Sequence, residues 1–161
     1  MREQFEATPV NILLVEDSEG DARLTKEVMR DSKIRNTIHH VLDGVEAMAF
    51  LHKQGKYAQV PRPDLILLDL NLPRKDGREV LAEIKKEKKF LQIPIVIMTV
   101  SDDEADVLKT YDLHANCYIV KPIGLIQFLK VVRSIEDFWL TIVKLPSGTR
   151  QPLAELPGAR R

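Results

Sequence analysis

The chain has 161 residues, 24 of them Lys or Arg and 24 Asp or Glu, so its formal net charge is zero. This balance argues against broad binding of nucleic acid or anionic membranes, because both need a surplus of positive charge. The single cysteine, Cys117, excludes a disulfide within the chain, and no apolar run approaches the length of a membrane-spanning helix. The first nine residues lack the apolar core of a signal peptide, so we expect a cytoplasmic protein of one domain.

Strand-like and helix-like segments alternate five times along the chain. Short apolar runs predict strands at residues 10–16, 36–42, 64–70, 93–100 and 116–121. Apolar residues that recur every three or four positions predict helices at residues 18–32, 44–54, 78–89 and 102–113, and a last helix that starts near residue 123. This alternation indicates an α/β fold, a doubly wound parallel sheet with right-handed crossovers. We expect residues 10–144 to form the domain, between a flexible N-terminus (1–9) and a C-terminal tail (145–161).

Polar side chains stand at the carboxyl ends of the predicted strands, where a doubly wound sheet binds its ligands. Glu16 and Asp17 follow the first strand, Asp69 the third, Thr99 the fourth and Lys121 the fifth. Three carboxylates suit a hard cation such as Mg²⁺, whose charge also explains how two adjacent acids stay ionised. A lysine and a hydroxyl beside a metal-bound aspartate suit a transferred phosphoryl group.

Each of these residues also has a simpler interpretation on its own. The two adjacent acids can cap a helix and match its dipole. Asp69 can be a turn residue, Thr99 an ordinary strand residue and Lys121 a solvated surface residue. The phosphoryl-transfer interpretation therefore depends on the conjunction of all five at the carboxyl ends of strands.

Four segments carry a resemblance to a known family: VEDS (Val15–Ser18), LLDLNLPRKDG (Leu67–Gly77), MTVS (Met98–Ser101) and YIVKP (Tyr118–Pro122). Over about residues 10–140 the sequence resembles the receiver domain of two-component response regulators. The resemblance implies the flavodoxin-like receiver fold, a five-stranded parallel sheet in the order 2-1-3-4-5 with five helices.

The resemblance implies that Asp69 accepts a phosphoryl group from a phosphohistidine of a sensor histidine kinase. Thr99 and Lys121 would contact the phosphoryl oxygens. Tyr118 matches the switch aromatic residue of the family, which turns inward on activation as Thr99 moves. The family also implies a cis peptide bond between Lys121 and Pro122, since cis bonds are essentially confined to proline.

The same resemblance implies that Glu16, Asp17 and Asp69 hold Mg²⁺ together with the backbone carbonyl of Asn71. The sequence departs from the commonest family pattern at Glu16, where Asp is more usual, and at Val100, where a smaller residue is common. A longer acid changes how the carboxylate reaches the metal, and a bulkier neighbour shields the phosphoryl group. Both departures leave the metal affinity and the phosphoryl lifetime open.

Two further stretches, residues 51–77 and EDFWLTIVKLP (residues 136–146), resemble the small single-domain regulators paired with cyanobacterial phytochromes. We therefore expect a stand-alone phosphoacceptor that signals through protein contacts and is not an enzyme. One alternative is a Mg²⁺-dependent phosphohydrolase of the haloacid-dehalogenase type, which would carry its nucleophile in a D-x-D motif on the first strand. The other is a pseudo-receiver that only docks, which would lack Asp69 or Lys121.

The last predicted helix carries two apolar stripes, whose residues recur at the three- and four-residue spacing of a helix face, with one step of seven. One stripe is Leu125, Leu129, Val132, Trp139 and Val143, and the other is Phe128, Val131, Ile135, Phe138 and Ile142. One stripe can join the core, and the other needs a partner because exposed apolar patches mark interfaces. We expect a homodimer in which the neighbouring strand 116–121 also takes part, with an interface of Phe128, Val131, Ile135 and Phe138. The alternative is that the C-terminal tail covers this stripe.

Overall fold

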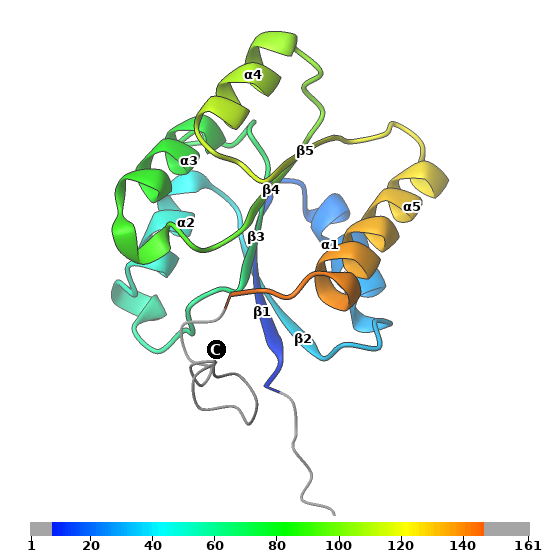
Figure 1. Cartoon of the computed structure of the whole chain (residues 1–161), viewed down its shortest axis with the longest axis horizontal. Coiled ribbons are helices and arrows are strands. Elements are labelled where there is room, and N and C mark those ends of the chain that lie inside the picture. The colour runs from blue at the N-terminus through cyan, green and yellow to red at the C-terminus, as the bar shows by residue number, and fades with distance from the viewer. Residues whose placement is uncertain (1–7, 147–161) are drawn as a thin grey trace, which may run out of the picture.

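The computed structural model describes residues 8–146, and its centre is a twisted sheet of five parallel strands (Figure 1). The strand order is β2-β1-β3-β4-β5, which confirms the predicted order. The strands are β1 (Val10–Val15), β2 (Asn36–Val41), β3 (Leu65–Leu68), β4 (Ile95–Thr99) and β5 (Cys117–Val120).

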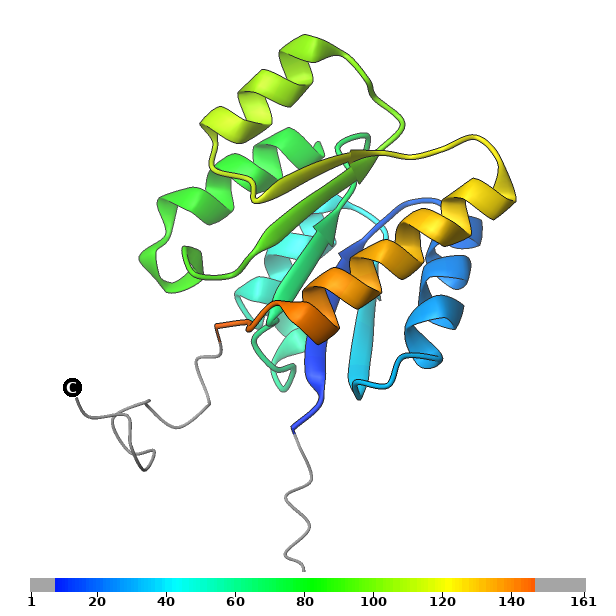
Figure 2. The ribbon, with the colours of Figure 1, turned by 45° about the vertical axis from the view of Figure 1, so that its right-hand side comes forward.

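Helices cover both faces of the sheet. Figure 2 shows α1 and α5 on one face, while α2, α3 and α4 lie on the other. A π-helix, Glu136–Ile142, continues directly from α5. The α-helices are α1 (Glu19–Arg30), α2 (Gly44–Leu51), α3 (Gly77–Lys86), α4 (Glu104–Asp112) and α5 (Leu125–Ile135).

The core has two layers because side chains alternate between the faces of each strand. On β1, Ile12 and Leu14 pack with residues of α1 and α5, while Leu13 and Val15 pack with residues of α2 and α3. The central strands are therefore buried on both faces, as their continuous apolar sequences predict.

Side-chain caps set the points at which four helices begin. Ser18, Asp43, Asp76 and Asp103 cap α1, α2, α3 and α4, and each accepts a hydrogen bond from a backbone N–H two or three residues further on. All four caps lie in loops that leave the carboxyl edge of the sheet, so they fix the loops that surround the predicted site.

The structure corrects the prediction for the last helix. Phe128 and Ile135, expected at a dimer interface, are 5% and 3% exposed and pack in the core with Val132 and Trp139. The spacings between these four buried residues are four, three and four. They come alternately from the two predicted stripes, because the face of the helix that meets α1 and the sheet lies between those stripes. Those two interface assignments are therefore wrong, while Val131 is half-buried and Phe138 is exposed.

The structure also corrects the expected conformation of the peptide bond before Pro122. The described residues contain no cis peptide bond, so the predicted cis bond before Pro122 is wrong, and the chain takes the trans form that is ordinarily preferred.

None of the helices in residues 8–146 has the length and apolar character needed to cross a bilayer. The predicted N-terminal segment and C-terminal tail lie almost wholly outside the described residues.

Candidate functional site

An acidic cluster lies where β1 and β3 end at the carboxyl edge of the sheet. Glu16 and Asp17 follow β1 directly, and Asp69 follows β3, its backbone N–H bonded to the carbonyl oxygen of Val15 at 3.0 Å. One carboxylate oxygen from each acid lies within 4.8 Å of the others. Glu16 and Asp69 are buried whereas Asp17 is exposed, so the cluster opens to solvent on one side.

Lys121 reaches into this cluster from the end of β5. Its ammonium group donates to Asp69 Oδ2 at 2.9 Å, to Asp21 Oδ2 at 3.1 Å and to Glu16 Oε1. Although burial opposes its positive charge, the bonds to Asp69 and Glu16 raise the pKa of Lys121 above its ordinary value. The lysine therefore stays protonated and offsets part of the repulsion among the acids.

One lysine does not fully compensate the acids around it. Burial raises the pKa of Glu16 to about 7, although the bond to Lys121 works against this shift. A further positive charge close by stabilises the ionised form of an acid whose pKa is raised by burial. The donor set consists of carboxylate oxygens, the ligands that Mg²⁺ prefers, and their spacing suits a single ion.

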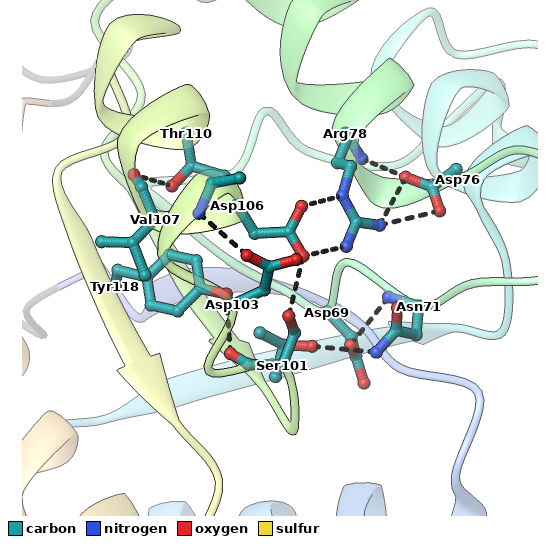
Figure 3. Close-up of polar contacts among 12 residues, drawn as sticks. Asp69, Asn71, Asp76, Arg78, Ser101, Asp103, Asp106, Val107, Thr110 and Tyr118 are labelled. Atoms are coloured by element: carbon teal, nitrogen blue, oxygen red, sulfur yellow. Dashed lines mark hydrogen bonds and ion pairs between the residues drawn. The ribbon is translucent and has the colours of Figure 1, made fainter.

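Thr99 and Asn71 form the other wall of the site. Thr99 ends β4 and is fully buried, and its Oγ1 accepts a long hydrogen bond of 3.4 Å from the side-chain amide of Asn71. The backbone N–H of Asn71 donates to Asp69 Oδ1 at 3.0 Å (Figure 3). Asn71 thus binds one carboxylate oxygen of Asp69 through its backbone, and Lys121 binds the other. The backbone N–H of Lys121 also donates to the carbonyl oxygen of Thr99 at 2.6 Å, so Thr99 and Lys121 are neighbours at the edge of the sheet.

The turn between β3 and α3 depends on Gly77. A Cβ atom at this position would lie 2.1 Å from the backbone oxygen of Asp69, a distance that no side chain can occupy. The Gly77 N–H also donates to the carbonyl oxygen of Leu70 at 2.9 Å. The glycine therefore lets the chain fold back tightly behind Asp69 and holds that residue in place.

Tyr118 lies on β5, on the face of the sheet that α2, α3 and α4 cover. Its ring packs against the core cluster on that face, and its hydroxyl donates to the carbonyl oxygen of Ser101 at 2.8 Å (Figure 3). Ser101 is two residues beyond Thr99, so the ring contacts the loop that carries the site's hydroxyl group.

The structure brings together all the residues that the sequence predicts for the phosphoryl and metal site. Sequence reasoning missed Asp21, which bonds Lys121 from the first turn of α1. It also missed Arg78 and Asp106, which join α3 to α4. The pairing of two residues 28 positions apart leaves no periodic signal in a single sequence.

Comparison with known proteins places most of the described region in one family. The family model described as "Response regulator receiver domain" matches residues 12–133. The chain is 53% identical to response regulator Rcp1 of Synechocystis sp. over 140 residues, which cover 87% of this chain and 95% of that protein. It is 35% identical to the probable methanogenesis regulatory protein FilR2 of Methanothrix harundinacea over 82% of this chain and 84% of that protein.

Two solved structures resemble this one closely. The Mn²⁺-bound form of response regulator Rcp1 has a TM-score of 0.85 and covers 86% of this chain and 100% of that chain. The phosphorylated cyanobacterial phytochrome response regulator RcpA is 50% identical, has a TM-score of 0.84 and covers 87% of this chain and 100% of that chain.

Proposed function

Because the chain belongs to the response regulator receiver family, we propose that it is a stand-alone response regulator whose Asp69 accepts a phosphoryl group from a phosphohistidine. The observation that carries the proposal is the surroundings of Asp69. It is a buried carboxylate in direct contact with the Lys121 ammonium group, inside a cluster of three acids at the carboxyl edge of the sheet.

In the proposed transfer, a carboxylate oxygen of Asp69 attacks the phosphorus atom, and the bond from phosphorus to the histidine nitrogen breaks. The electron pair of that bond returns to the imidazole, and an acyl phosphate forms on Asp69. Lys121 and the Thr99 hydroxyl donate to the phosphoryl oxygens as they leave the histidine. These fixed donors stabilise the charge on the transferred group, which is the main contribution a protein makes to phosphoryl transfer.

The proposed metal is Mg²⁺, held by Glu16, Asp17 and Asp69 with the backbone carbonyl of Asn71. The oxygen donors and their spacing support this assignment, and the Rcp1 structure of similar fold is a Mn²⁺-bound form. When bound, the ion supplies charge that offsets the phosphoryl oxygens and keeps the two adjacent acids ionised.

The proposed phosphoryl donor is a sensor histidine kinase, with a phytochrome as its sensory part. The likeness to RcpA, a phosphorylated cyanobacterial phytochrome response regulator, supports this choice. The reaction takes place in the cytoplasm and involves neither nucleic acid nor membrane, and its output is a changed surface for protein contacts. The only turnover expected is self-catalysed transfer and loss of the phosphoryl group.

The two alternative functions are less well supported. The acceptor Asp69 follows β3, and the two acids after β1 are adjacent, which is not the D-x-D arrangement of a haloacid-dehalogenase phosphohydrolase. A docking pseudo-receiver would lack the acceptor or the lysine, whereas here Asp69 and Lys121 are present and bonded to each other.

We also propose that the protein forms a homodimer through the end of its last helical segment. Phe138 and Ile142 are 49% and 65% exposed there and lie four residues apart, and neighbouring exposed apolar side chains can mark an interface. This interface replaces the predicted one, from which the burial of Phe128 and Ile135 removes two residues.

Intact mass measured after incubation with acetyl phosphate and Mg²⁺ tests the phosphorylation proposal. We expect one added phosphoryl group on the wild type and none on Asp69→Asn. Asp64→Asn is the matched control, because Asp64 is also buried and lies at the opposite end of the same strand, where its side chain binds the Asn11 N–H. Equal labelling of the wild type and Asp69→Asn would overturn the assignment.

A further inference from the structure

A chain of polar contacts joins α3, α4 and β5 beside the proposed phosphorylation site (Figure 3). Arg78, near the start of α3, donates from Nε to Asp106 Oδ1 at 2.7 Å and from Nη2 to Asp106 Oδ2 at 2.5 Å. Asp106 lies in the first turn of α4. A third donor of the same guanidinium group, Nη1, binds the carboxylate of Asp76, the α3 cap, at 3.1 Å. This two-pronged geometry fixes the orientation of both partners, which a lysine could not do.

The same carboxylate also holds the loop between β4 and α4. Asp106 Oδ2 accepts a hydrogen bond of 2.7 Å from the Ser101 hydroxyl, and the Ser101 carbonyl oxygen accepts one of 2.8 Å from Tyr118. Three consecutive polar contacts therefore connect the guanidinium group to the Tyr118 ring. They pass through a residue only two positions beyond Thr99.

The charges in this network are partly protected from water. The side chains of Arg78 and Asp106 are 23% and 19% exposed. Arg78 and then the Ser101 hydroxyl lower the pKa of Asp106 to about 2, so the ion pair persists throughout the neutral range. Charge-assisted bonds in such a setting are stronger than those of a fully solvated surface pair.

We propose that Arg78 is a positioning residue for phosphorylation: through Asp106 and Ser101 it holds the β4–α4 loop and keeps the Tyr118 ring inward. This proposal rests on the proposed function. Thr99 can donate to a phosphoryl oxygen only if the loop that follows it is correctly placed, and Ser101 is held there from two sides. Tyr118 packs against the core cluster in this arrangement.

The consequence is a thermodynamic coupling between Arg78 and the phosphoryl group, although they need not touch. If both favour the same arrangement of the loop and of Tyr118, each increases the other's stabilising effect. Loss of the clamp therefore lowers the affinity for a phosphoryl group, and it also loosens the Tyr118 ring in the unphosphorylated protein.

The test compares Arg78→Gln with Lys75→Gln, which removes a different ion pair of the same helix. Lys75 binds Glu83 at 2.5 Å and joins the β3–α3 turn to α3 itself. Beryllium fluoride with saturating Mg²⁺ serves as the phosphoryl mimic, and its affinity is measured by titration. NMR spectra of the Tyr118 ring report on the arrangement of the free protein.

We expect Arg78→Gln to weaken beryllium fluoride binding about five-fold or more and to shift the Tyr118 ring signals. Lys75→Gln should change the affinity for beryllium fluoride by less than two-fold and leave the Tyr118 ring signals in place. Arg78→Lys should have effects between those of Arg78→Gln and Lys75→Gln. The double variant Arg78→Gln, Asp106→Asn should lose less affinity than the two single losses added together, because both substitutions remove the same interaction. An Arg78→Gln protein that matches Lys75→Gln in both measurements would overturn the proposal.

Two further variants keep the test decisive if Arg78→Gln fails to fold. Ser101→Ala leaves the ion pair intact and removes only the bond from the loop to Asp106, and we expect the same direction of change from it. Unchanged affinity and unchanged ring signals in Ser101→Ala would also refute the clamp. If the wild type does not bind beryllium fluoride, the proposed function fails, while the Tyr118 signals of the free proteins still decide whether Arg78 holds the ring.

Discussion

At the scale of single residues, Lys121 dominates the electrostatics of the site. Its ammonium group contacts Glu16, Asp21 and Asp69 at once, and two of these three acids are buried. A phosphoryl group or a metal ion that enters the site must therefore compete for, or share, contacts that this lysine already makes. The exposed Asp17 is the acid of the cluster that faces solvent, which makes it the natural first contact for a cation.

This difference predicts unequal roles for the two adjacent acids in metal binding. We expect Asp17→Ala to weaken Mg²⁺ binding well beyond Glu16→Gln, because the Glu16 carboxylate is already engaged by Lys121 and by the Ser18 N–H. Titration of Mg²⁺ against backbone amide chemical shifts measures both affinities. Equal losses in the two variants, or no loss in either, would contradict the proposed ligand set.

Much of the site could be predicted from the sequence because strand ends are easy to locate. Each predicted site residue stands at or just after the end of an apolar run, and parallel strands bring such positions together at the carboxyl edge of the sheet. Asp21 and Arg78 escaped prediction for a different reason. Their contacts depend on where the fold places the long side chains of Lys121, which meets Asp21, and of Arg78, which meets Asp106. No apolar pattern in the sequence marks that placement.

At the scale of elements, the phase of α5 shows why the burial of a helix is harder to predict than its existence. Apolar residues cover more than one face of this helix, so the sequence allows several choices of buried stripe. The position of α1 and the sheet selects the stripe that contains Phe128, Val132 and Ile135. Tertiary packing, which local periodicity does not contain, therefore settles which apolar side chains stay outside.

The bond between α3 and α4 predicts a loss of stability in acid. The pKa of Asp106 in the folded protein is about 2, lowered chiefly by Arg78, against an ordinary value of 3.8. Its stabilising effect is present above the ordinary pKa and is lost as the pH falls through the folded value. After allowance for screening by water, we expect about 1 kcal/mol.

Urea unfolding of the wild type and Asp106→Asn between pH 6 and pH 2 measures this contribution. The wild type should be more stable at pH 6, and the gap between the two proteins should close as the pH approaches 2. Asp112→Asn removes an acid from the other end of the same helix and is the control. A gap that stays constant over this range would mean that Asp106 titrates normally.

At the scale of the whole molecule, the proposed self-association rests on the exposed apolar side chains of the last helical segment. Phe138 and Ile142 lie four residues apart in the π-helix, and the Phe138 ring contacts the buried Trp139 edge-on. A two-fold interface repeats the same patch on both subunits, so each side chain is buried twice. Burial of one such side chain contributes roughly 1.5–3 kcal/mol, which makes a weak to moderate dimer reasonable.

We therefore expect the wild type to be dimeric at micromolar concentration and Phe138→Glu to be a folded monomer. The added carboxylates would be desolvated without partners in a dimer, whereas in the monomer the position is open to water. Ile135→Glu is the informative contrast, because it places an acid in the core and should unfold the protein. Light scattering reports the mass and circular dichroism the fold. A wild type that is monomeric at high micromolar concentration, or a Phe138→Glu variant that stays dimeric, would show that this segment is not the interface.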